Sequence, residues 1–294
     1  MARLVEAAPS DNLHLFDLPY RFSSWAFDDP GNVGLWFTET SELAAWAVMQ
    51  APFWTIDYAL SPGASSNLHR RVLNWADGRA RALLGTSSGH PCWFINAFPG
   101  LTQRILDIEE SGFANQSDVG IDSWSKVFMQ RPADLPVKDY RIPPGFIIRP
   151  LRGEQEVPAY TELHRTVFES KSMTGEWRSR TLSHPAYRSE LDLVVAAPDG
   201  RLAAFCIGWL HQSPGLPLVG QIEPLGCHPE FRRYALGRLV LVETIRRLQA
   251  AGASHIVVET DNNRSTAFAL YESLGFQVTQ TVNVFRKDFG GIDG

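Results

Sequence analysis

Cysteine is scarce in this sequence. Cys92, Cys206 and Cys227 are the three among 294 residues, and they lie far apart in the chain. An odd number of widely spaced cysteines favours neither a disulfide framework nor a zinc site, so no bound metal is predicted. Because reduced thiols are typical of the cytosol, the sequence predicts a cytoplasmic protein.

Long apolar runs and an excess of basic residues are also lacking. No stretch of about twenty apolar residues occurs, so no membrane span is predicted. Residues 1–11 lack the apolar core of a signal peptide, and we expect them to form a frayed tail. The net charge of −5 argues against nucleic acid as the main partner. The composition leaves the oligomeric state open.

The composition is that of a folded protein with two domains. Apolar residues make up 44% of the chain and charged residues 20%. A length of 294 residues exceeds that of most single domains. Residues 131–146 contain four prolines and are typical of a linker. We therefore expect an N-terminal domain at residues 1–140 and a C-terminal domain at residues 141–294.

Hydrophobic periodicity predicts strands and helices in both halves. In the N-terminal half we expect strands at residues 33–37, 44–49, 54–60, 92–97 and 119–129, and helices at 68–84 and 101–111. In the C-terminal half we expect strands at 146–151, 191–197, 202–209, 219–226, 256–260 and 277–286, and helices at 156–168, 176–182 and 239–250. The strand at 277–286 is expected to finish the C-terminal sheet.

The two halves share their order of elements, which indicates a degenerate internal repeat. Each half ends a helix with a Gly-Phe pair, Gly112-Phe113 in the first and Gly275-Phe276 in the second. Aligning these pairs places Ile108 where Tyr271 stands. An ordinary α/β domain could show the same order without a repeat, and this alternative stays open.

Residues 218–249 combine an apolar strand, a His-Pro turn, a basic loop and an amphipathic helix. A helix N-terminus presents unpaired amides and partial positive charge. Small residues let a polyanion approach these amides, and arginines add fixed charge. The sequence therefore predicts a phosphate-binding loop, here named the phosphate loop, made of Arg232, Arg233, Tyr234, Ala235, Leu236, Gly237 and Arg238. The corresponding turn of the first half, residues 61–66, carries no arginine.

Two motifs resemble those of the GCN5-related N-acetyltransferases, the GNAT family. Arg232-x-x-Ala235-x-Gly237 resembles the family's acetyl-CoA loop, which usually has glycine where Ala235 stands. The stretch from Asn263 to Phe276 resembles the closing signature N-x-x-A-x-x-L-Y-x-x-x-G-F, with Asn263 one residue out of place. The resemblance covers about residues 146–289.

This resemblance implies an α/β fold of the α+β type. We expect two tandem GNAT-like domains, each with a mixed, mostly antiparallel sheet flanked by helices, and the N-terminal one degenerate. The layout resembles that of mycothiol synthase, a two-repeat member of the family.

The resemblance also implies acetyl-CoA as cosubstrate and assigns two catalytic roles. Tyr271 would supply a proton to the departing thiolate, because a phenol keeps its proton at neutral pH; a packed core tyrosine is the alternative. Glu223 would accept the amine proton, directly or through water. Strict alternation would place Glu223 on one face with Gln221 and Leu225. A plain hydrogen-bonded carboxylate is the alternative, and further candidates for the base are Glu259, His211 and His228.

The remaining cofactor contacts follow from the same resemblance. Family members splay two strands beside the acetyl group, and Pro224 suits such a break. The acetyl group would lie along Leu225, Gly226 and Cys227, and Asn263 would complete the cofactor-binding residues. A nucleophilic Cys227 is a less favoured alternative, since the family transfers the acyl group directly.

The leading hypothesis is an N-acetyltransferase that moves an acetyl group from acetyl-CoA to a primary amine of a small molecule or peptide by direct attack. Alternatives are an acyl-CoA-binding regulator without turnover and a tandem scaffold whose tryptophan-rich first half binds a ligand. The acceptor pocket is expected at residues 168–184. This segment mixes Glu176, Trp177, Arg178 and Arg180, so it indicates no acceptor charge.

Overall fold

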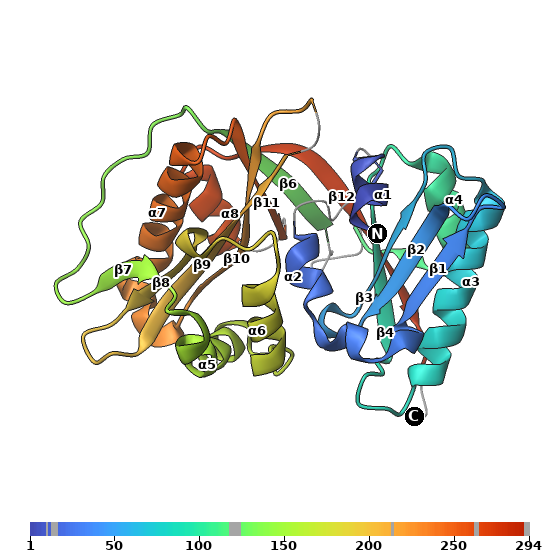
Figure 1. Cartoon of the computed structure of the whole chain (residues 1–294), viewed down its shortest axis with the longest axis horizontal. Helices are drawn as coiled ribbons and strands as arrows, with labels where there is room; N and C mark the ends of the chain where they lie inside the picture. The colour runs from blue at the N-terminus through green and yellow to red at the C-terminus, as the bar shows by residue number, and fades with distance from the viewer. Residues whose placement is uncertain (10, 13–16, 118–124, 213–214, 262–264, 291–294) are drawn as a thin grey trace. The chain divides into compact units, whose positions relative to one another are not determined.

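The computed structural model describes residues 1–9, 11–12, 17–117, 125–212, 215–261 and 265–290. The chain divides into two compact units. The first comprises Met1–Val127, Asp261–Asn263 and Gln280–Gly294, and the second comprises Phe128–Thr260 and Arg264–Thr279. Each unit is a mixed, mostly antiparallel sheet flanked by helices (Figure 1), as the sequence predicts.

The units differ from a simple division at residue 140. Residues 128–140 group with the second unit, and the end of the chain returns to the first. The cause of this return is β12 (Gln277–Asp288), whose residues Asn283 to Asp288 pair antiparallel with β4 (Cys92–Ala97). The expectation that this strand finishes the C-terminal sheet is therefore wrong for residues 283–288, because backbone pairing with β4 places them in the first unit.

The sheet of the first unit has the strand order β1-β2-β3-β4-β12. β3 and β4 pair in parallel, and the other neighbours pair antiparallel. The remaining described elements of this unit are β1 (Val33–Phe37), β2 (Leu43–Gln50), β3 (Thr55–Leu60), β5 (Ala114–Asn115), α1 (Ala2–Glu6), α2 (Leu18–Phe22), α3 (Ser66–Leu83), α4 (Thr102–Glu110) and the 3-10 turns Trp25–Asp28, Pro30–Asn32 and Ala51–Phe53.

Helices cover both faces of this first sheet. Alternate residues of β2 serve the two faces: Trp46 packs with Val5 of α1, and Ala47 packs with Val72 of α3. The expectation of a frayed N-terminus is wrong, because Val5 is 1% exposed and the Trp46 indole donates to the Met1 carbonyl at 3.2 Å. Burial of an aliphatic side chain such as Val5 stabilises the folded state by roughly 1.5–3 kcal/mol, which favours an ordered helix here.

The sheet of the second unit has the strand order β6-β11-β10-β9-β8-β7. β10 and β11 pair in parallel, whereas β7, β8, β9 and β10 pair antiparallel in succession. Among the described residues, no helix is long and apolar enough to cross a membrane. The elements are β6 (Ser125–Pro132), β7 (Ile147–Pro150), β8 (Asp192–Ala196), β9 (Leu202–His211), β10 (Val219–Cys227), β11 (His255–Asp261), α5 (Val157–Phe168), α6 (Gly175–Ser183), α7 (Leu236–Ala250), α8 (Ser265–Glu272) and the 3-10 turns Gly153–Glu156, Ser189–Leu191 and Pro229–Tyr234.

Both faces of this second sheet are also covered. A Cβ added to Gly208 of β9 would lie 3.1 Å from Thr244, so glycine lets α7 approach the strand closely. Phe205, of opposite parity on β9, packs against Tyr160 of α5 with ring centroids 5.1 Å apart. The helices α7 and α5 therefore lie on opposite faces of β9.

The ends of α4 and α8 share one hydrogen-bond pattern, as the predicted internal repeat requires. Gly112 and Gly275 follow these helices with φ angles of +87° and +86°. The next amides return to the same position, Phe113 to Ile108 at 3.3 Å and Phe276 to Tyr271 at 3.2 Å. Such a left-handed residue after the last turn ends a helix with its carbonyls satisfied. Ile108, fully buried, therefore occupies the position that Tyr271 has in the second unit.

Candidate functional site

The parallel ladder of the second unit stops halfway along β10. It consists of three pairs, from Val219–His255 to Gln221–Val257, and β11 continues to Asp261. Among the described residues, β10 makes no further pair with β11 after Gln221. The backbone groups of the last part of β10 on this side thus lie beside an opening between two strands, where a ligand can reach them.

A bulge in β10 coincides with this break. The pairing with β9 passes from Ile222–Gly208 to Leu225–Cys206, which leaves one extra residue on β10. A Cβ on Gly220 would meet Leu248 of α7, whereas one on Gly226 would meet Phe205 and Val167 on the α5 face. The prediction of strict alternation along residues 221–226 is therefore wrong, because the extra residue changes which face each later side chain takes.

The phosphate loop joins a 3-10 turn to α7. Ala235 stands between them with φ +56° and ψ 26°, a left-handed conformation. This geometry explains why glycine is usual at the position, since a Cβ costs roughly 1–2 kcal/mol in that region. The first bond of the helix runs from the Leu239 amide to the Ala235 carbonyl at 3.1 Å. The amides of Leu236, Gly237 and Arg238 consequently lack acceptors within the helix.

No side chain caps this helix start, and basic side chains surround it. Arg232 and Arg233 are exposed, and the Arg238 guanidinium donates to the Ser273 hydroxyl at 2.9 Å. A Cβ on Gly237 would meet the Cys227 Cβ at 3.6 Å, an ordinary contact, so its absence mainly leaves room outside the helix. Amides without acceptors in the helix, a helix dipole and fixed positive charge together suit a phosphate group.

Two residues of the loop contribute differently from the others. The Leu236 side chain is fully buried, so only its amide can contact a ligand. Tyr234 is 36% exposed, and its ring lies 5.1 Å from that of Phe146. It is thus available to contact a ligand from the outside of the loop.

The Glu223 carboxylate is one of the groups that raise the pKa of Tyr271. Tyr271 is buried, with its ring 5.5 Å from that of Phe276. Burial raises the pKa of Tyr271 well above 10, and the Cys206 and Glu223 charges raise it further. Glu223 is half-buried, and its carbonyl accepts the Trp209 indole N–H at 2.7 Å. The phenol therefore stays protonated at neutral pH beside a carboxylate that is partly open to solvent.

The other predicted residues fall into distinct surroundings. The His228 ring accepts the Glu230 amide at 3.3 Å and thereby shapes the turn before the phosphate loop. Burial raises the pKa of the Cys227 thiol despite the opposing effects of the Gly237 amide and Arg232, which disfavours a thiolate nucleophile. Glu259 and His211 are half-buried at the ends of β11 and β9. Asn263 lies outside the described residues.

A buried charged cluster holds α6, and sequence reasoning missed it. Arg178, predicted to line the acceptor pocket, is fully buried and forms an ion pair with Asp192 of β8. The Tyr187 hydroxyl donates to the same carboxylate at 2.8 Å, and the Arg178 guanidinium stacks 3.8 Å from the centre of the Tyr160 ring. Arg178 therefore anchors the segment instead of meeting solvent. The sequence contains one sign that this helix faces inward. The residue next to Arg178 is the large apolar Trp177, which is 1% exposed in the structure.

Comparison with known proteins agrees with this arrangement. Residues 157–276 match the model of the acetyltransferase (GNAT) family. A mycothiol acetyltransferase of Salinispora arenicola is 27% identical over 153 residues, which is 50% of each chain. Another, from Acidothermus cellulolyticus, is 26% identical over 178 residues, or 55% of this chain and 54% of its own. The chain thus spans about half the length of the curated relatives it matches.

Solved structures extend the likeness of fold to the whole chain. A tandem GNAT protein from the clavulanic acid biosynthesis pathway superposes with a TM-score of 0.65 at 13% identity, over 99% of this chain and 94% of its own. A GCN5-related N-acetyltransferase from Sphaerobacter thermophilus gives 0.63 at 18% identity, over 90% and 83%. The predicted fold class, two tandem GNAT-like units, is confirmed. Residues 157–276 of the second unit are thus similar to the GNAT family of acetyltransferases.

Proposed function

We propose that the second unit transfers an acetyl group from acetyl-CoA to a primary amine of a small molecule or peptide. The observation that carries this proposal is the uncapped start of α7, with Gly237 and the exposed arginines of the phosphate loop beside it. The loop amides and Arg232, Arg233 and Arg238 would hold the pyrophosphate of the cosubstrate. The open side of β10 at Leu225, Gly226 and Cys227 would receive the pantetheine arm and the acetyl group.

Glu223 and Tyr271 divide the proton transfers in this proposal. The amine nitrogen bonds to the thioester carbonyl carbon, the carbon–sulfur bond breaks, and the proton lost by the amine passes to Glu223 directly or through water. Tyr271 directs its O–H to the departing sulfur. Its pKa lies above 10, whereas a simple thiol has one of about 8.5, so complete proton transfer is uphill by roughly 2 kcal/mol or more. A hydrogen bond that stabilises the developing thiolate is therefore the favoured role.

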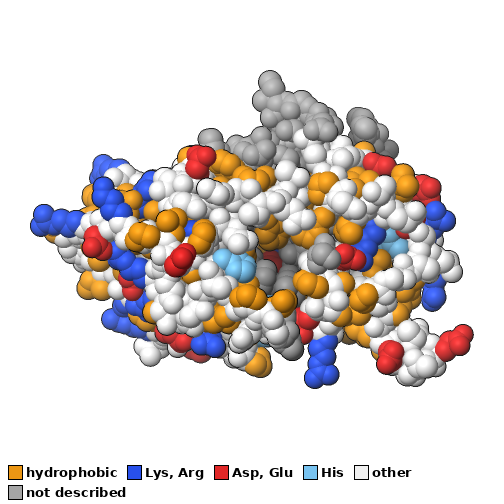
Figure 2. Space-filling view, turned by 90° about the horizontal axis from the view of Figure 1, so that it is seen from above, with side chains coloured by type: hydrophobic (Ala, Val, Ile, Leu, Met, Phe, Trp, Pro, Cys, Tyr) orange, Lys and Arg blue, Asp and Glu red, His pale blue; other side chains and the backbone are white. Residues whose placement is uncertain are grey.

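The acceptor is proposed to be a small molecule or peptide. Two of the relatives described above are mycothiol acetyltransferases, which supports an amine-bearing small molecule. On the face drawn in Figure 2, acidic and basic side chains are interspersed among apolar ones, and basic residues form no continuous stripe in the coloured part of that view. The three cysteines are free thiols, which supports the cytoplasmic location expected from the sequence.

A panel of primary amines with acetyl-CoA tests the proposal, read by the release of free thiol and by the mass of the product. We expect a saturable, amine-dependent release with at least one member. Titration calorimetry should show one CoA per chain. Binding of CoA without acetylation of any amine would favour a regulator, and failure to bind CoA would contradict the proposal outright.

The pH dependence of kcat/KM tests the role of Glu223. A carboxylate that accepts the amine proton produces a fall in rate at acidic pH. The substitution Glu223→Gln should remove or shift this acidic limb while CoA affinity stays within about twofold of the parent. An unchanged acidic limb would transfer the role to Glu259 or His211.

A further inference from the structure

The first unit contains its own hollow between two diverging strands. β3 and β4 pair only at Thr55–Phe94 among the described residues. Beyond this pair lie an inner pocket of about 30 Å³ and an outer groove of about 400 Å³, which share Asp11, Leu101 and Arg104 as a common wall. The inner pocket has room for one small head group, and the groove has the size of a small-molecule site.

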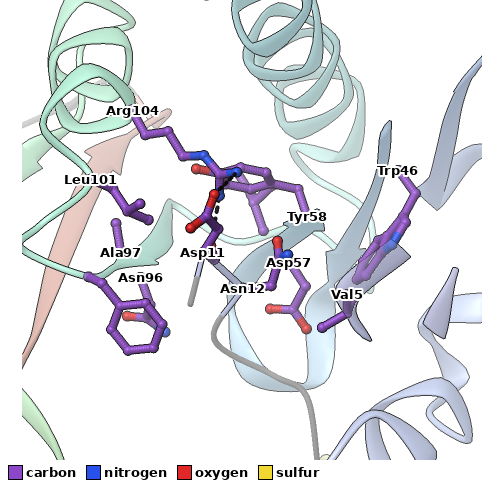
Figure 3. A pocket seen from close by; sticks show the side chains of 12 residues that line it. Val5, Asp11, Asn12, Trp46, Asp57, Tyr58, Asn96, Ala97, Leu101 and Arg104 are labelled. Atoms are coloured by element: carbon purple, nitrogen blue, oxygen red, sulfur yellow. Dashed lines mark hydrogen bonds and ion pairs between the residues drawn. The ribbon is translucent and has the colours of Figure 1, made fainter. Parts of the chain in front are cut away.

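Two carboxamide oxygens in the wall of the inner pocket lack donors. Asn12 is 4% exposed, and its amide nitrogen donates to the Ala8 carbonyl at 2.7 Å, which fixes the side-chain orientation. Its Oδ1 atom is buried without a hydrogen-bond partner among the described residues, and so is the Oδ1 atom of Asn96. Figure 3 shows that these side chains reach the pocket from separate segments of the chain. A buried acceptor without a donor costs about 1–3 kcal/mol, so a donor is expected there.

A hydrogen-bonded chain orients a third acceptor toward the same pocket. The His69 Nδ1 atom lies 3.0 Å from the Asp107 carboxylate, and Nε2 lies 3.0 Å from the Tyr58 hydroxyl. An ionised carboxylate can only accept, so Nδ1 carries the proton and Nε2 accepts from Tyr58. Because the phenol donates to His69, its oxygen lone pairs remain for a ligand. Tyr58 lines the inner pocket, and His69 and Asp107 line the outer groove.

Charged groups of both signs lie around the hollow. Asp57 lines the inner pocket and accepts from Arg21 at 3.0 Å and from Thr55 at 2.9 Å. The Arg21 guanidinium also lies 2.7 Å from the Asp17 carboxylate, so it pairs with both Asp17 and Asp57. At the wall, Arg104 forms an ion pair with Asp11 at 3.4 Å, drawn as dashed lines in Figure 3. Asp107 is paired with Arg70 at 3.3 Å.

We propose that the first unit binds a small primary ammonium compound, with its head group in the inner pocket and its body in the outer groove. An ammonium group offers three donors and no acceptor. This set complements the oxygens of Asn12, Asn96 and Tyr58, and the Asp57 carboxylate lines the same pocket. The proposal does not depend on acetyl transfer by the second unit.

Titration of the full chain with serinol and with glycerol tests this site, since the two molecules differ only in an ammonium or a hydroxyl on the central carbon. We expect saturable serinol binding with a Kd of about 1 mM or lower, and binding of glycerol at least about tenfold weaker. Equal affinities, or no saturable serinol binding up to about 10 mM, would overturn the proposal and leave ordered water as the occupant.

Variants of Asn96 place the binding in this pocket. Asn96→Leu removes an acceptor and should weaken serinol binding at least about tenfold, while CoA affinity stays unchanged. Asn96→Asp keeps the acceptors, adds a negative charge and should tighten serinol binding relative to glycerol. The matched control is Asn74→Leu on the exposed surface of α3. If neither Asn96 variant changes the affinity for serinol, the assignment to this pocket is wrong, whatever the outcome for acetyl transfer.

Discussion

The helices α3 and α7 follow the central strands of their units, yet their first amides are satisfied differently. At α3 the Ser65 side chain accepts the Leu68 amide at 3.3 Å, and no arginine precedes the helix in residues 61–66. At α7 the capping residue is Ala235, which has no side-chain acceptor, and arginines surround the helix start. A serine oxygen takes the place that a phosphate oxygen would occupy. The two units therefore share a scaffold, but only the second has a helix start without a side-chain cap.

The two units also differ in the surroundings of a buried histidine. Burial lowers the pKa of His69, but the bond to Asp107 opposes this shift. Burial, followed by the charges of Arg178 and Arg165, lowers the pKa of His164 to about 3. One unit thus provides a carboxylate partner for its histidine, whereas the other surrounds its histidine with cations.

The largest expected effect concerns the tyrosine that only the second unit has at the end of its last helix. Tyr271→Phe should lower kcat by about a hundredfold or more, because the thiolate loses its hydrogen-bond donor. CoA affinity should stay nearly unchanged, since the ring still packs on Phe276. Single-turnover kinetics on a true substrate measure this effect. Tyr20→Phe, which removes a buried hydroxyl from the first unit, is the control. If Tyr271→Phe carries out the chemical step at the parent rate, Tyr271 has no role in the mechanism.

The second largest expected effect is a loss of folding stability at acidic pH, caused by the buried His164. As the pH falls below 6.5 the unfolded chain protonates His164 and the folded chain does not, so stability decreases toward the folded pKa of about 3. At pH 5 this loss is roughly 2 kcal/mol. His164→Phe keeps the stacking on Phe205 and should recover about this amount at pH 5 relative to pH 8. Denaturant unfolding at both pH values measures it, and equal gains at both would point to packing instead of charge.

The glycine of the phosphate loop gives a smaller effect on binding. In Gly237→Val, branched methyl groups would stand where the pyrophosphate should approach the loop amides. CoA affinity should fall at least about tenfold, or 1.4 kcal/mol. Gly78→Val of α3 is the matched control, because a Cβ at Gly78 meets nothing within 4 Å. Calorimetry measures both affinities. If the two folded variants bind CoA equally well, the assignment of the phosphate loop is wrong.

The two helix caps give the smallest expected effects, with opposite signs. Ser65→Ala should destabilise the protein by about 1 kcal/mol, because the Leu68 amide loses its acceptor. Ala235→Gly should stabilise it by up to about 1 kcal/mol, since relief of the left-handed strain exceeds the entropy cost of glycine. Thermal unfolding measures both. A destabilised Ala235→Gly variant would show that the Ala235 Cβ makes packing contacts worth more than the strain.

Much of the element order was predictable because local patterns decide it. The strand Cys92–Ala97 has the predicted bounds, and α3 and α7 follow apolar spacing and turn signals. The helix-ending Gly-Phe pairs were also readable, because a left-handed residue after a helix favours glycine whatever surrounds it. The motif around Gly237 predicts the phosphate loop for the same local reason, and its binding role stays a proposal.

Other features depended on contacts between distant segments. The bulge at residues 222–225 changes the face of every later side chain on β10, and it arises from register with β9. Arg178 has the composition of a surface residue, and only the position of Asp192 explains its burial. Asn12 and Asn96 are 84 residues apart in number, and no periodicity links them to one pocket.

The sequence by itself determined the local elements, the tandem order and the open helix start of the second unit, because these follow from residue type and spacing within a few turns of chain. The tertiary structure decided that β12 ends in the first unit, that the Glu223 charge raises the pKa of Tyr271, and that the unpaired oxygens of Asn12 and Asn96 line one pocket with the Tyr58 hydroxyl. Such features depend on strand register and on side chains from remote segments, and their energies arise only once the sheet has formed.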